Sequence, residues 1–108
     1  MNPWLRIVRA GNLIVSFAGV IVGGLAAAGS GIQLPASFWI AVLLAAISTA
    51  CITAAGNVLN DVRDIDTDRT NHPDRPLVQG SISLPQARAL TASLFIVGIA
   101  VVVPILPT

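Results

Sequence analysis

Three aspartates, Asp61, Asp64 and Asp68, are the residues of this chain whose type and spacing best suit chemistry. Their spacing of i, i+3 and i+7 places all three on one face of a helix, with Asn57 and Asn60 close above them. Carboxylates that face the same way repel one another unless a cation lies between them. Hard oxygen ligands of this kind suit Mg²⁺ that is shared with a phosphate-bearing substrate.

The acidic cluster follows directly on a long apolar stretch. Residues 10–60 carry no charge, and all five acidic residues lie between Asp61 and Asp74. Carboxylates are costly to place near a bilayer, so this position indicates a functional site. The alternative is a solvated charge cluster that caps a membrane helix. Carboxylates at the C-terminal end of a helix oppose its dipole, so we favour a metal–phosphate site over the cap.

A calcium-binding loop is a second alternative for the same residues. Asp64, Asp66 and Asp68 would occupy its positions 1, 3 and 5. Position 6, which requires glycine, is Arg69, and position 12, which requires glutamate, is Arg75. The spacing therefore excludes an EF-hand.

The segment after the aspartates is rich in turn-forming residues and carries Arg69 and Arg75. Pro73 and Pro76 stiffen it, and Gly80 permits a tight turn before the next apolar segment. Arginine is well suited to bidentate contact with phosphate. A stiff segment that holds two guanidinium groups beside a Mg²⁺ site predicts a diphosphate-binding cradle.

The composition is that of a membrane protein. Hydrophobic residues make up 55% of the chain, charged residues only 10%, and the mean hydropathy is +0.83. Soluble domains have about a quarter of their residues charged. The net charge of +1 provides no general attraction to nucleic acid. Cys51 stands alone in an apolar run, and we interpret it as a packing residue.

Three apolar segments predict an all-α, polytopic transmembrane bundle with helices at about 11–28, 38–59 and 84–106. Each is close to the roughly 20 residues that cross a hydrocarbon core. The third follows Ser83-Leu84-Pro85, a helix start with proline in its first turn. Gly19 and Gly23 form a small-xxx-small pair, which predicts close helix packing on that face.

The arginines predict how the chain is oriented in the cell membrane. All six basic residues are arginines: Arg6, Arg9, Arg63, Arg69, Arg75 and Arg88. The loop at 29–37 is uncharged. The positive-inside rule therefore places the N-terminus and the Asp-rich loop at about 60–82 in the cytoplasm. Arg88 is interpreted as a membrane-side anchor and His72 as an ordinary loop residue.

A cleaved signal peptide is an alternative for the N-terminus. Two arginines, an apolar run and the small residues before Gly29 fit that pattern. Two further apolar segments and the acidic segment between them favour a membrane helix instead.

The residues after Leu59 resemble a known family. The motif is Asn60-Asp61-x-x-Asp64-x-x-x-Asp68, followed by Arg69, Asn71, Pro73, Asp74-Arg75-Pro76-Leu77 and Gly80-Ser81-Ile82-Ser83. It resembles the first aspartate-rich motif and the following loop of the UbiA family of intramembrane prenyltransferases. The resemblance extends upstream through Arg9-Ala10-Gly11-Asn12. The most similar branch makes the second ether bond of archaeal-type lipids. Branches that act on aromatic, chlorophyll-pathway or quinone-pathway acceptors share much of the loop and remain alternatives.

The resemblance implies an enzyme and a role for each matching residue. The implied reaction is Mg²⁺-dependent transfer of a prenyl group, expected to be geranylgeranyl, from its diphosphate to a lipid-type acceptor such as geranylgeranylglyceryl phosphate. The implied Mg²⁺ ligands are Asn60, Asp61, Asp64 and Asp68, of which the three aspartates are also the expected catalytic residues. The implied substrate-binding residues are Arg9, Asn12, Asn57, Arg69 and Arg75.

The chain also departs from the family. Family members have about nine membrane helices and a second aspartate cluster in a later loop, whereas no acidic residue follows Asp74 here. We therefore expect residues 1–108 to be the N-terminal part of one UbiA-type domain. We expect this part to need the remaining helices as its partner and to be inactive alone. A separate, non-catalytic three-helix membrane protein that binds a cation or anionic lipid headgroups is the alternative.

Overall fold

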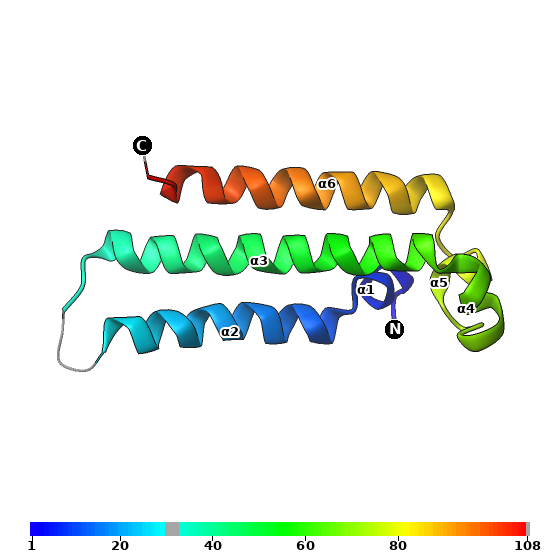
Figure 1. The fold of residues 1–108 in the computed structure, drawn as a ribbon, viewed down its shortest axis with the longest axis horizontal. Helices are drawn as coiled ribbons and strands as arrows, with labels where there is room; N and C mark the ends of the chain where they lie inside the picture. Colours follow the sequence, from blue (N-terminus) through cyan, green and yellow to red (C-terminus); the bar gives the residue numbers. More distant parts are fainter. Residues whose placement is uncertain (30–32, 108) are drawn as a thin grey trace.

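Three long antiparallel helices form the molecule, and the middle one contacts both others (Figure 1). A computed structural model describes residues 1–29 and 33–107, all of them helical or in connections. The long helices are α2 (Ala10–Ala28), α3 (Ala36–Arg63) and α6 (Leu84–Val102), which the short 3₁₀ helix η1 (Val103–Ile105) extends. All three are long and apolar enough to cross a membrane. The predicted all-α, three-span fold is confirmed.

Short helices lie at one end of the molecule, where the N-terminus is found (Figure 1). They are α1 (Pro3–Val8), α4 (Ile65–Asn71) and α5 (Pro76–Gln79). The segment at 60–82, predicted to be a loop, is therefore largely helical. Residues 30–32 of the predicted loop at 29–37 lie outside the described part of the chain, and α3 begins directly after Pro35.

The second membrane helix continues beyond its predicted end at Leu59. It runs to Arg63, so Asn60 and Asp61 belong to helix α3 rather than to a loop. Tertiary packing is the reason, because Val58 and Asp61 are buried in the last turns of α3 against neighbouring elements. A helix of 28 residues is about 42 Å long, whereas the hydrocarbon core measures about 30 Å. The polar last turns of α3 can therefore reach the membrane surface.

Small residues allow the long helices to approach closely. A Cβ atom on Gly24 of α2 would lie 2.7 Å from Cγ1 of Val42, and one on Gly98 of α6 would lie 2.8 Å from Cδ1 of Ile52. Beside the second contact, Ser48 Oγ donates to the carbonyl oxygen of Gly98 over 2.7 Å. Close backbone approach and hydrogen bonds of this type hold membrane helices together, since apolar burial discriminates little between protein and lipid.

The predicted packing face of α2 is wrong for the contacts within this chain. A Cβ atom on Gly19 or Gly23 would meet nothing within 4 Å, so neither glycine is at a close helix contact here. Gly24, the next residue, is at the contact with α3 instead. The small-xxx-small pattern predicted a contact at Gly23, but the contact with α3 is at Gly24. One residue corresponds to a rotation of about 100° around the helix axis.

A small hydrophobic core fixes the end of the molecule where the short helices lie. It consists of Ile7, Val58, Leu77, Ile82 and Ala87. These five buried residues come from α1, α3, α5, the turn before α6, and α6 itself. The core therefore ties the N-terminal helix and the segment at 72–82 to α3, and it determines where their polar side chains lie.

Local signals that were read from the sequence define the entry into α6. Gly80 has φ +81°, the left-handed conformation that favours glycine. Ser83 Oγ accepts from the backbone N–H of Gln86 over 3.2 Å, and Gln86 Oε1 accepts from the backbone N–H of Ser83 over 2.9 Å. This reciprocal pair satisfies two N–H groups that the helix leaves open. The predicted helix start is confirmed.

Candidate functional site

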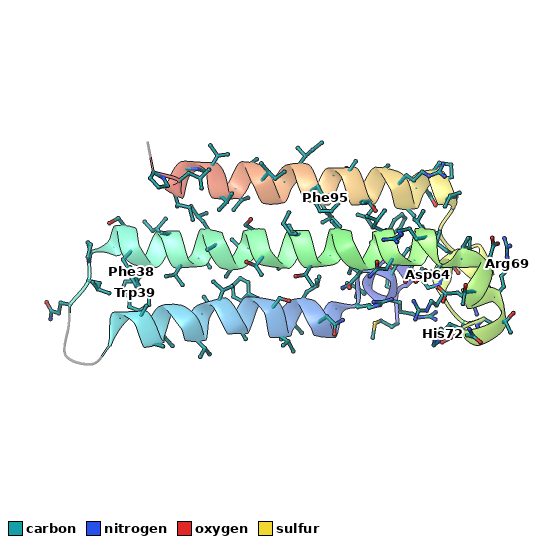
Figure 2. All side chains as sticks on the ribbon, viewed as in Figure 1. Phe38, Trp39, Asp64, Arg69, His72 and Phe95 are labelled. Carbon is teal, nitrogen blue, oxygen red and sulfur yellow. The ribbon has the colours of Figure 1, made fainter. Side chains whose placement is uncertain are left out.

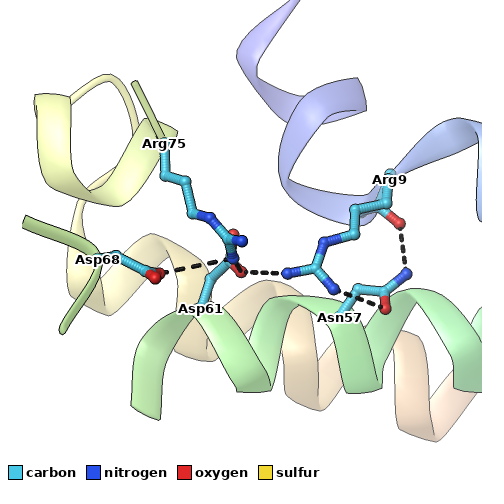
Figure 3. A network of polar contacts seen from close by, with 6 residues as sticks. Arg9, Asn57, Asp61, Asp68 and Arg75 are labelled. Carbon is cyan, nitrogen blue, oxygen red and sulfur yellow. Dashed lines mark hydrogen bonds and ion pairs between the residues drawn. The ribbon is translucent and has the colours of Figure 1, made fainter. Parts of the chain in front are cut away.

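Asp61 is the centre of a polar cluster at the end of α3 (Figure 3). Its side chain is 3% exposed. Its Oδ1 atom accepts from Arg9 Nη2 over 2.9 Å and from Arg75 Nη1 over 2.7 Å. A buried carboxylate requires such partners, because desolvation without them strongly disfavours its charge. Two guanidinium groups from distant parts of the chain therefore meet on one carboxylate oxygen.

Arg75 joins a second buried carboxylate to this centre. Its Nη1 atom lies 3.5 Å from Asp68 Oδ2, and Asp68 is 4% exposed. The carboxylates of Asp61 and Asp68 thus converge on a single guanidinium group, as Figure 3 shows. Arg75 stands where a cation shared by the two aspartates would be expected.

Arg9 reaches Asp61 from an unusual backbone conformation. It separates α1 from α2 and has φ +56° and ψ +69°, which makes it the only non-glycine residue with positive φ in the described chain. The left-handed conformation costs an L-residue about 1–2 kcal/mol. Contacts of the side chain with Asp61 and Asn57 offset that cost. Backbone strain that persists in this way is common at functional sites.

Asn57 lies one turn before Asp61 on α3, and its side chain contacts both Arg9 and the end of α1. Its Oδ1 atom accepts from Arg9 Nη1 over 3.5 Å, and its Nδ2 atom donates to the carbonyl oxygen of Val8 over 2.9 Å. Val8 ends α1, so its carbonyl has no partner within that helix. Asn57 therefore caps α1 and positions Arg9 with one amide group. Its predicted contact with substrate stays a prediction.

A pocket of about 510 Å³ opens beside this cluster. Four of the residues predicted as site residues line it: Arg9, Asn12, Asp61 and Arg75. Asp68 and Asn57 are connected to the pocket through Arg75 and Arg9. The structure thus brings six of the predicted site residues into one cluster at the mouth of the helices.

The other predicted site residues lie apart from the pocket. Asp64 occupies the junction between α3 and α4, with φ −100° and ψ 14°, and it is exposed. Asp61 lies on α3 and Asp68 on α4, so the three aspartates do not belong to one continuous helix. The prediction that the three aspartates share one helix face is therefore wrong. Asn60 is exposed on α3, and Arg69 is exposed and pairs with Asp66 over 2.6 Å (Figure 2).

The donor chemistry of the cluster fits a divalent metal ion. Across residues 1–29 and 33–107, no three His, Cys, Asp or Glu side chains stand together at metal-binding positions. Asp61 and Asp68 nevertheless direct their carboxylates at the same guanidinium cation. These two buried carboxylates are hard oxygen donors of the kind that bind divalent metal ions.

Reasoning from the sequence missed helix α1 and the role of its last residues. Asn2 caps this helix by accepting from the backbone N–H of Trp4 over 2.8 Å, and Pro3 occupies its first turn. An Asn-Pro pair before an apolar run is a helix-start signal, so the helix itself could have been recognised. The contact of Val8 with Asn57 could not, because 49 residues separate the two.

A bundle of three apolar helices with an ion-paired acidic cluster at one end defines a multi-span helical membrane protein. The chain belongs to the UbiA prenyltransferase family, whose sequence profile matches residues 16–108.

Relatives of this chain are named for one activity within that family. Digeranylgeranylglyceryl phosphate synthase of Methanoculleus marisnigri is 46% identical over 94% of this chain, and that of Saccharolobus solfataricus is 37% identical over 93%. A solved structure described as that synthase in membranes superposes with a TM-score of 0.81, at 34% identity over 92% of this chain. The chain spans about 34% of the length of each of these three proteins.

Proposed function

We propose that residues 1–108 form the diphosphate-binding part of an enzyme that transfers a geranylgeranyl group to geranylgeranylglyceryl phosphate in ether-lipid synthesis. The observation that carries the proposal is the convergence of Asp61 and Asp68 on Arg75 beside a pocket. Names of the relatives support the choice of acceptor, since those proteins are digeranylgeranylglyceryl phosphate synthases.

The proposed chemistry follows from the charges at the pocket. Asp61 and Asp68 would hold Mg²⁺, and the neighbouring exposed Asp64 and Asn60 would be its further ligands. When bound, Mg²⁺ neutralises charge on the leaving diphosphate, which favours ionisation of the allylic C–O bond. The acceptor hydroxyl oxygen then forms the new ether bond with the prenyl carbon as the C–O bond to diphosphate breaks. Diphosphate leaves with Mg²⁺, and the hydroxyl proton passes to the released diphosphate or to water.

Arg75 has two alternative partners in this scheme. Without substrate its guanidinium group bridges Asp61 and Asp68. A diphosphate offers the same group a bidentate contact, which is the stronger type of charge-assisted hydrogen bond. Arg9 remains on Asp61 and Asn57, so it keeps the carboxylate in place while Arg75 changes partner. Asn12 lines the same pocket and can add a contact to the diphosphate, whereas Arg69 pairs with Asp66 at the surface.

A chimera would test the proposed activity directly. In it, residues 1–108 replace the matching third of the synthase from Methanoculleus marisnigri. We expect the purified chimera in lipid to convert radiolabelled geranylgeranyl diphosphate and geranylgeranylglyceryl phosphate into product, and to need Mg²⁺ to do so. The intact synthase is the control. A correctly folded chimera that binds both substrates but forms no product, or forms it equally well in chelator, would contradict the proposal.

The orientation in the membrane is a second expectation. The end of the molecule that carries the short helices also carries all six arginines, so we expect it to face the cytoplasm. Cysteine labelling of intact cells would test this in a Cys51→Ala background. We expect His72→Cys to react with an impermeant maleimide only after permeabilisation, and Gln33→Cys, at the opposite end of the helices, to react without it. The reverse pattern would overturn the orientation.

A further inference from the structure

The outer half of the pocket is not used by the proposed diphosphate chemistry. Its lining includes Met1, Leu5 and Arg6 from the N-terminal segment, and His72 and Asp74 from the segment between α4 and α5. Asp61 is paired with Arg9 and Arg75 rather than with these residues. A second ligand group could therefore sit beside the diphosphate without competing for Asp61.

Arg6 is the positive group of this outer half. Its Nη2 atom donates to the backbone carbonyl of Asp74 and lies 3.7 Å from Asp74 Oδ2. The Asp74 side chain is 77% exposed, and ion pairs with so exposed a partner contribute little to stability. A guanidinium group carries five N–H donors, and both contacts with Asp74 use the same nitrogen atom. Arg6 is thus held at the pocket by a partner that an anion can replace.

Apolar side chains lie next to this cation. Met1 is 87% exposed and Leu5 is 51% exposed, and both line the same pocket as Arg6. His72 lines the pocket too, and its imidazole N–H is a second donor. A cation and a donor flanked by exposed apolar groups, at the end of the helix bundle where the short helices lie, are complementary to an amphiphile that has an anionic head and an alkyl chain.

We propose that Arg6 and His72 form the subsite for the phosphate of the acceptor, a lipid monophosphate whose chain leaves over Leu5, and that Asp74 holds Arg6 until this phosphate replaces it. The subsite rests on the proposed function for its place in the reaction. It assigns the two anionic groups of the reaction to different arginines, with the diphosphate at Arg75 and the monophosphate at Arg6.

Binding to the 108-residue chain would test the subsite without any need for turnover. The protein is placed in phosphatidylcholine nanodiscs with Trp39→Phe, so that Trp4, next to Leu5, is its single fluorescent indole. An alkylglycerol monophosphate is titrated, and the same alkylglycerol without phosphate is the matched ligand. We expect Arg6→Gln to raise the dissociation constant about tenfold, as expected for loss of one charge-assisted hydrogen bond. We expect the phosphate-free ligand to bind more weakly and to be unaffected by Arg6→Gln.

Two further variants separate binding from folding. Asp74→Asn removes the competing carboxylate and keeps Arg6, so we expect it to tighten binding of the phosphate ligand several-fold. Arg88→Gln removes the same charge from α6, away from the pocket lining, and we expect a change of less than about twofold. If Arg6→Gln and Asp74→Asn weaken binding alike, the pair is structural and the proposal is overturned. Equal effects of Arg6→Gln and Arg88→Gln would overturn it as well.

Competition identifies the source of the phosphate. We expect free glycerol phosphate and nanodiscs that contain phosphatidylglycerol to compete poorly with the alkylglycerol monophosphate. Competition by free glycerol phosphate at equal concentration would overturn a lipid ligand, and equal competition by phosphatidylglycerol would overturn an acceptor-specific subsite. Failure here is distinguishable from failure of the proposed function. The chimera could form product while Arg6→Gln leaves binding of the phosphate ligand unchanged. That pair of results would overturn the subsite and leave the proposed function standing.

Discussion

Asp61→Asn in the chimera should lower prenyl transfer by at least about 10²-fold, the loss typical of removing a principal electrostatic stabiliser of a transition state. Asparagine has nearly the same shape but carries no charge. It would leave Arg9 and Arg75 without the carboxylate on which both converge, and it would remove one of the two buried oxygen ligands that face a common cation. Initial rates with radiolabelled geranylgeranyl diphosphate at saturating acceptor would measure the effect.

Asp66→Asn is the matched control for this substitution. It makes the same chemical change five residues later, on an exposed side chain that pairs with Arg69 at the surface. Surface pairs of this kind contribute little, so we expect activity within about twofold of the parent chimera. Thermal unfolding in detergent would show that both variants are folded. Near-normal turnover by a folded Asp61→Asn variant would rule out Asp61 as the central carboxylate.

Residues 1–108 alone should insert into membranes but catalyse no transfer, whereas the chimera does. A prenyl diphosphate carries about three negative charges near neutral pH, and holding it in a site of low dielectric constant calls for more positive charge than one metal ion supplies. The described chain provides a single acidic cluster, around Asp61 and Asp68. Few residues of α2 and α6 are buried in the described part of the chain, so this part alone would shield an allylic cation from water poorly.

The same substrates and lipid would serve both arms of this comparison. The chimera is the positive control, and a sample without protein provides the blank. Mg²⁺-dependent product from the 108-residue chain above that blank would show that three helices suffice for catalysis. That result would contradict the expectation that this chain works only together with further helices.

The membrane class, the number of spans and the start of α6 could be predicted from the sequence, because each depends on short-range features. An uncharged run of about 20 residues has few alternatives to a membrane helix. The capping residues Ser83 and Gln86 act across one helical turn. The acidic cluster stood out for a similar reason, since carboxylates beside an apolar helix are costly unless they have a function.

The composition of the candidate site was decided by tertiary structure. The pattern of aspartates assumed one continuous helix, but the chain turns at Asp64, which leaves Asp61 and Asp68 buried and Asp64 exposed. No local rule predicts that turn, because burial of Val58 and Leu77 against α1 and α6 sets the course of the chain there.

The pairing of Arg9 with Asp61 shows the limit of the sequence most clearly. The two residues are 52 positions apart, and their contact depends on how α1 packs against α3. The sequence shows which residues are charged, and its hydrophobic pattern predicts the helices on which these residues lie. Which charges neutralise one another is determined by the packing of those helices, because an ion pair at a distance of 3 Å tolerates only small changes in helix position.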